Sequence, residues 1–188
     1  KAIKLVYAST FLKEPKALIE ASVHHHEEEK MAVIIMELIG KTHKERFYPS
    51  VSGLAQSFNY YPTSYMKRNE GVAYIALGLG RTISDGEKSL RFAPKYPAII
   101  PQYYSVRSTI SNSQNHFYAL NLEKGAELLK KNEHENTTLY DLNTAESDGE
   151  LFWAASTVSS SDNKIRDSLK DDGVRVVTFP SLLKWNTA

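Results

Sequence analysis

Residues 71–97 constrain the fold more than any other segment. The apolar run at 72–77 ends at Gly78-Leu79-Gly80, and an Asp85-Gly86 pair follows five residues after Gly80. This pattern is typical of a buried strand that ends in a tight loop, because glycine adopts backbone angles that other residues avoid and lets a ligand approach the main chain. A strand that leads into a glycine loop is one way to build a phosphate site. The alternative is a turn that only joins two strands.

Two upstream runs give this loop its context. Residues 31–36 form a continuous apolar run that ends in Glu37, Leu38 and Ile39, and a second strand-like run covers 48–58 and contains Ser-Gly-Leu at 52–54. Runs this apolar need cover on their faces. We therefore expect 31–37, 51–58 and 72–77 to be adjacent strands of one sheet, covered by two N-terminal helices.

The end of the first run has the chemistry of an adenine hinge. Adenine offers an N6 donor and an N1 acceptor on one edge, and one main-chain carbonyl and one main-chain amide can match them. The Glu37 C=O and the Ile39 N–H, with Leu38 between them, are natural partners for that edge. The alternative is a strand that simply turns at Gly40.

The order of these motifs resembles the nucleotide-binding domain of phosphoenolpyruvate synthase and pyruvate phosphate dikinase, a branch of the ATP-grasp superfamily. The resemblance covers residues 1–105 and rests on Glu37-Leu38-Ile39, Ser-Gly-Leu at 52–54 and the Gly-Leu-Gly loop. It implies an α+β fold, an ATP-grasp-like subdomain with an antiparallel-rich sheet covered by helices. It also implies a cofactor site at Glu37, Leu38, Ile39, Gly78, Gly80, Arg81 and Asp85.

The chain departs from that family pattern in two places. Arg81 stands where the family usually carries Glu; a guanidinium cannot bind Mg²⁺, but it can bond two phosphate oxygens at once. Asp85 is then the nearest acidic candidate for a metal, unless it only starts the Asp85-Gly86 turn. The Lys and the Arg-Ser-Ser segment that the family places before the hinge do not appear. We therefore expect a fragment of a longer parent.

For that parent, the resemblance implies that ATP phosphorylates a histidine on a swivelling domain, which passes the phosphoryl group to pyruvate to make phosphoenolpyruvate. ATP and Mg²⁺ are the cofactors implied for the intact parent, where catalysis is mainly positioning and charge neutralisation. Pyruvate and phosphoenolpyruvate would bind to other domains, and the isolated fragment is expected to be inactive. The alternative is a degenerate, non-catalytic ATP-grasp scaffold. Residues 106–188 are either a C-terminal extension of the same domain or an accessory interaction module.

Composition excludes several other classes. The 188 residues contain no cysteine, and a net charge of +1 gives no electrostatic footprint for nucleic acid or an anionic membrane. The longest apolar run is far below the roughly 20 residues that span a bilayer. The adjacent triplets His24–His26 and Glu27–Glu29 do not predict a metal site, because consecutive side chains on a helix point in different directions and form no compact ligand set. We expect a cytoplasmic chain with no nucleic-acid or membrane partner.

The remaining pattern predicts a mixture of short elements. Apolar spacing predicts helices at 2–12 and 15–26, and strands at 138–142 and 174–179. A short helix is expected at 163–169, with Asp162 as its N-cap.

Overall fold

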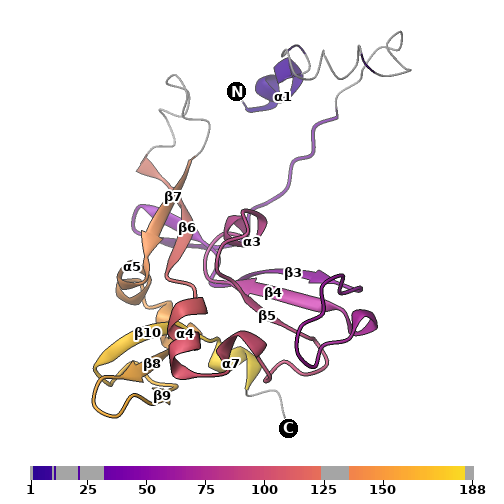
Figure 1. Ribbon diagram of the computed structural model, residues 1–188. Coiled ribbons are helices and arrows are strands. Elements are labelled where there is room, and N and C mark those ends of the chain that lie inside the picture. The colour runs from indigo at the N-terminus through magenta and orange to yellow at the C-terminus, as the bar shows by residue number, and fades with distance from the viewer. Residues whose placement is uncertain (1, 10, 12–20, 22–31, 124–135, 185–188) are drawn as a thin grey trace. The chain divides into compact units, whose positions relative to one another are not determined.

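The computed structural model describes residues 2–9, 11, 21, 32–123 and 136–184 (Figure 1). The chain divides into two compact units, Lys1–Leu38 and Ile39–Ala188, which are described separately. In the first unit, helix α1 spans Ala2–Ser9 and confirms the first predicted helix. The predicted helix at 15–26 lies outside the described residues.

The predicted strand at 31–37 is wrong for the residues described. Residues 32–40 lie in no strand or helix, and the side chains of Ile34, Ile35 and Met36 are 82%, 78% and 83% exposed. A strand is stable only where a neighbour takes up its main-chain N–H and C=O groups. Within the described residues, no neighbouring strand pairs with this run.

The described residues of the second unit form three antiparallel sheets. The first has the order β1-β2-β6-β7, the second β3-β4-β5 and the third β10-β8-β9. Their bounds are β1 Lys41–His43, β2 Arg46–Tyr48, β3 Ser52–Gln56, β4 Val72–Ala76, β5 Leu90–Phe92, β6 His116–Asn121, β7 Thr137–Asp141, β8 Ala155–Ser159, β9 Ile165–Arg166 and β10 Gly173–Val177.

Strands β3 and β4 are adjacent, as expected for the second and third runs. Their register runs from Ser52 opposite Ala76 to Gln56 opposite Val72, and β5 pairs with the other edge of β4. These antiparallel sheets, mixed with helices, confirm the predicted α+β class with antiparallel-rich sheets. The predicted strands at 138–142 and 174–179 are β7 and β10.

Short helices connect the strands. They are η1 Arg68–Glu70, α3 Arg81–Ser84, η2 Pro101–Tyr103, α4 Val106–Asn112, α5 Leu142–Ser147, α6 Leu151–Ala154 and α7 Pro180–Leu183. Among the described residues, no helix is long and apolar enough to cross a membrane. The core of this unit joins distant parts of the sequence, because Tyr48, Leu77, Phe117, Leu151 and Phe179 are fully buried in one cluster.

The predicted helix at 163–169 is wrong. Asn163 has a φ of +54°, and Ile165 pairs with Val158 as part of β9. The Asp162 carboxylate accepts a hydrogen bond from the Lys164 N–H at 3.2 Å. Asp therefore closes a local turn between two strands, because its short side chain bonds nearby backbone equally well in a turn or at a helix start.

Candidate functional site

The Gly-Leu-Gly loop leaves the end of β4 and enters α3. Gly78 has a φ of +82°, and a Cβ there would lie 2.7 Å from the Tyr118 carbonyl oxygen of β6. The Leu79 N–H donates to the same oxygen at 2.8 Å. Gly78 is therefore required by the close approach of β6, since any side chain would push the two segments apart.

Gly80 has different surroundings. Its φ is −60°, which any residue adopts, and a Cβ there would meet only the Ser52 Cβ at 3.7 Å. Gly80 is also exposed. The main chain at Gly80 is therefore open on the side from which a ligand could approach, whereas Gly78 is closed by β6.

A buried amide side chain holds the end of β4 in place. The Gln114 Oε1 accepts from the Leu77 N–H at 2.8 Å, and its Nε2 donates to the Leu77 C=O at 2.9 Å and to the His116 C=O at 2.8 Å. Gln114 thus takes the place of a neighbouring strand for Leu77. No local sequence signal points to this role, because Gln114 lies in a polar stretch without apolar periodicity.

Arg81 and Asp85 are brought together at the end of the loop. One helical turn separates them, and the Arg81 Nε donates to the Asp85 Oδ2 at 2.8 Å. The Arg81 Nη1 donates to the Thr137 Oγ1 at 2.8 Å, and the guanidinium lies 4.7 Å from the centroid of the Tyr118 ring. The Arg81 side chain is 33% exposed and that of Asp85 is 42% exposed, so solvent reaches both partners.

The described residues do not form a Mg²⁺ site by themselves. Mg²⁺ needs several oxygen ligands in a near-octahedral set. Asp85 is already paired with Arg81, and the described residues contain no group of three or more His, Cys, Asp or Glu side chains arranged to hold a metal ion.

The three hinge candidates divide between the two units. Glu37 and Leu38 belong to the first unit and Ile39 to the second, and all three are exposed. Within the described residues, neither the Glu37 carbonyl nor the Ile39 amide takes part in a main-chain hydrogen bond.

A pocket of about 520 Å³ lies on the β3-β4-β5 sheet, beside the segment that follows α3. Its lining includes Leu54 of β3, Tyr74 of β4, Arg91 of β5 and residues 86–89 of the turn after α3. This volume falls in the range of small-molecule sites. Sequence reasoning missed it, because its walls come from segments that are far apart in the chain.

Two buried carboxylates tie the β1–β2 hairpin to the turn between α5 and α6. Arg46 forms two hydrogen bonds with Asp148, and the Tyr48 hydroxyl donates to Asp148 Oδ2 at 2.8 Å. Burial works to raise the pKa of Asp148, but the hydrogen bonds from Arg46 and Tyr48 outweigh it and hold that pKa below its ordinary value. The neighbouring Glu150 lies 3.4 Å from the His43 Nε2.

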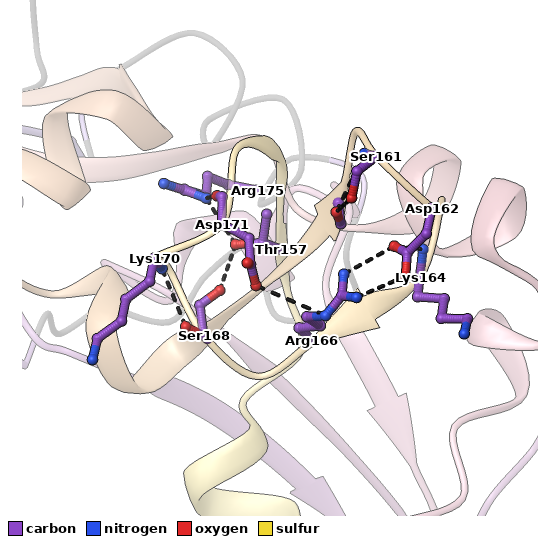
Figure 2. A network of polar contacts seen from close by, with 10 residues as sticks. Thr157, Ser161, Asp162, Lys164, Arg166, Ser168, Lys170, Asp171 and Arg175 are labelled. Carbon is purple, nitrogen blue, oxygen red and sulfur yellow. Dashed lines mark hydrogen bonds and ion pairs between the residues drawn. The ribbon is translucent and has the colours of Figure 1, made fainter.

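Figure 2 shows a second polar network, around β8, β9 and β10. Arg166 forms two hydrogen bonds with Asp162, and this pair lowers the pKa of Asp162 to about 2. Arg175 donates to Thr157 Oγ1 and to the Asp171 carbonyl. These contacts fix the connections between the three strands, and Arg166 and Arg175 each pair with a carboxylate, Asp162 and Glu146 respectively, which is the pattern of a structural network.

Comparison with known families identifies the class of protein. A family model described as the pyruvate phosphate dikinase AMP/ATP-binding domain matches residues 1–173. The chain belongs to this family of nucleotide-binding phosphotransferase domains, which confirms the resemblance inferred from the motif order. Neither the curated proteins nor the solved structures gave a match.

Proposed function

We propose that the chain is a fragment of an ATP-dependent phosphotransferase of the phosphoenolpyruvate synthase and pyruvate phosphate dikinase type. It would contribute the adenine hinge and one wall of the ATP site. The observation that carries this proposal is the Gly-Leu-Gly loop, which is open at Gly80 and leads directly to Arg81, in a chain that belongs to an AMP/ATP-binding family. We assign the nucleotide-binding part to residues 1–105 and an extension of the same domain to 106–188, which the pairing of β2 with β6 supports.

Each candidate residue has a distinct role in this proposal. The Glu37 carbonyl and the Ile39 amide bond the edge of adenine, and Leu38 spaces them. Gly78 fixes the loop against β6, and Gly80 lets phosphate approach the main chain. Arg81 binds phosphate oxygens by exchanging its contact with Asp85 for them, since a guanidinium pairs equally well with carboxylate and phosphate.

The remaining parts of the reaction belong to the intact parent. We propose that the parent supplies the further ligands for Mg²⁺, the phosphorylated histidine and the pyruvate and phosphoenolpyruvate site. Mg²⁺ would neutralise the charge of the transferred phosphoryl group. We also propose a cytoplasmic location and no nucleic-acid partner, in keeping with the nearly balanced charge.

Replacing Arg81 tests its proposed role in binding the phosphates of ATP. Calorimetric titration of the intact parent with ATP should show that Arg81→Ala weakens binding by about 1.5–3 kcal/mol, the usual range for a charge-assisted hydrogen bond. The matched control is Arg166→Ala, because Arg166 is also paired with an aspartate four residues away. Unchanged ATP affinity in Arg81→Ala would remove Arg81 from the site.

The competing proposal is a degenerate, non-catalytic binding or scaffold module. The position of Arg81 favours it, because Asp85, Thr137 and the Tyr118 ring already engage the guanidinium. An assay for ATP-dependent phosphorylation of the parent separates the two. Phosphorylation in the wild type supports the phosphotransferase, whereas the absence of both ATP binding and phosphorylation supports the scaffold.

A further inference from the structure

The two faces of the β3-β4-β5 sheet differ in chemistry. Side chains alternate along a strand, so Ile75 of β4 and Leu90 of β5 face the core cluster, while their neighbours Tyr74 and Arg91 face the other way. That other face is the floor of the 520 Å³ pocket. The Gly-Leu-Gly loop and Arg81 are not among the residues that line this pocket.

Arg91 is a half-buried cation whose side-chain partners among the described residues are uncharged. Its Nη2 donates to the Asn59 Oδ1 at 2.9 Å and to the Tyr61 carbonyl, and its guanidinium lies 5.6 Å from the centroid of the Tyr74 ring. Within the described residues, no carboxylate forms an ion pair with Arg91, and its Nε is buried without a hydrogen-bond partner. Burying an uncompensated charge is costly, and a bound anion would offset that cost.

The rest of the lining suits a flat ring. Tyr74 lies on the floor, and Tyr60 and Tyr61 stand at the rim with exposed fractions of 67% and 81%. Aromatic side chains stack on planar ligands, and exposed aromatics gain apolar burial when they do so. Lys88 and Glu87 also line the pocket, and Lys88 has no ion pair in the described part of the chain, whereas the Glu87 carboxylate accepts a hydrogen bond from the Tyr118 hydroxyl. With Arg91, the lining carries two cations and one carboxylate, so its net charge of +1 favours an anion.

We propose that this pocket binds a planar aromatic anion of mononucleotide size, with Arg91 pairing with the anionic group and the tyrosines holding the ring. This pocket is a second site, separate from the proposed ATP site at the Gly-Leu-Gly loop, because it lies on a different part of the sheet. A ligand with both a ring and an anionic group should bind more tightly than one with either alone, since each part has its own partners in the pocket.

NMR titration of the ¹⁵N-labelled 188-residue chain with AMP tests the site. We expect amide shifts at Leu54, Tyr74 and Arg91, with adenosine and ribose 5-phosphate each binding at least about tenfold more weakly than AMP. Arg91→Gln should weaken AMP binding by about tenfold or more, and Lys88→Gln by about threefold because Lys88 is exposed. The control Lys95→Gln removes an equal charge outside the pocket and should leave AMP affinity unchanged.

Several results would overturn the inference. They are AMP shifts confined to residues 78–85 or absent, adenosine binding as tightly as AMP, or unchanged AMP affinity in both Lys88→Gln and folded Arg91→Gln. If Arg91→Gln does not fold, Lys88→Gln and the comparison of the three probes decide the outcome. The two proposals fail separately. If Arg81→Ala weakens ATP binding but Arg91→Gln leaves AMP binding unaffected, only the proposed pocket is rejected. If Arg91→Gln weakens AMP binding but Arg81→Ala leaves ATP binding unaffected, only the proposed role of Arg81 in the ATP site is rejected.

Discussion

Gly78 and Gly80 are two residues apart in one loop, yet a side chain would meet different surroundings at each. At Gly78 a Cβ would press into the Tyr118 carbonyl and the Phe117 side chain, and φ is positive. At Gly80 the backbone is ordinary and the space is open. The first glycine is thus a requirement of the fold, while the second keeps the main chain accessible.

This difference predicts opposite outcomes for one type of substitution. Gly78→Ala should lower the free energy of unfolding by about 3 kcal/mol, because backbone strain and a backbone clash add together. Gly80→Ala should change it by no more than about 0.5 kcal/mol. Urea unfolding of both variants checks this. Equal destabilisation by the two substitutions would contradict our account of the loop.

The sequence predicts the loop but not the reason for Gly78. An apolar run followed by Gly-Leu-Gly is enough to place a strand end and a turn. The clash that requires Gly78, however, comes from Tyr118, whose pairing with this loop no local pattern encodes. Similarly, the i,i+4 spacing brings Arg81 and Asp85 together, but the contact of Arg81 with Thr137 depends on the tertiary fold.

At the level of elements, the pairing of β4 with β3 and β5 stops before Leu77. The Gln114 side chain bonds the main-chain N–H and C=O of Leu77 in their place. Gln114→Met keeps the volume but leaves the Leu77 N–H and C=O buried without partners. We expect a loss of about 3 kcal/mol in the free energy of unfolding, since each unsatisfied buried group costs about 1–3 kcal/mol. Gln56→Met on the exposed face of β3 is the control and should cost no more than about 0.5 kcal/mol. Equal effects in urea unfolding would show that Gln114 does not anchor β4.

The hydrogen bonds of Asp148 with Arg46 and Tyr48, which join the α5–α6 turn to the β1–β2 hairpin, predict that stability depends on pH. Folding lowers the pKa of Asp148 below its ordinary value of 3.8. The ionised carboxylate therefore contributes fully to the free energy of unfolding above pH 3.8, and this contribution is lost as the pH falls through the lower, folded-state pKa. The free energy of unfolding should therefore decrease with acidification below 3.8. Asp148→Asn should cost about 3 kcal/mol at pH 7, because it leaves the Arg46 charge buried without its partner.

Urea unfolding measured over a range of pH tests the role of Asp148. Asp148→Asn should show a shallower loss of stability on acidification than the wild type, and Tyr48→Phe should lie between them because it removes one hydrogen bond. An identical acid dependence in all three proteins would rule out Asp148 as the titrating group.

Strand neighbours explain which elements the sequence could predict. The pairing of β3 with β4 follows from two apolar runs joined by turn residues, and the structure confirms it. Residues 31–37 are equally apolar, but a strand also needs a partner, which composition does not reveal. At 163–169, the side chain of Asp162 closes a turn between β8 and β9, where the same residue can equally begin a helix.

At the level of the whole molecule, one unit carries the Gly-Leu-Gly loop, the β3-β4-β5 sheet and the pocket above it, while Glu37 and Leu38 lie in the other unit. Motif order was sufficient to predict the family, because the relevant residues are close together in sequence. The pocket was not predictable, since its walls come from β3, β4, β5 and the segments between them.

The central claim is that this chain supplies part of an ATP site that other parts of the parent complete. Calorimetric titration with ATP and Mg²⁺ of the 188-residue chain and of the intact parent, side by side, tests it most directly. A partial site leaves most of the ligand in water, so the chain alone should bind ATP at least about 100-fold more weakly than the parent. Micromolar, Mg²⁺-dependent ATP binding by the 188 residues alone, or no ATP binding by the parent, would contradict the account.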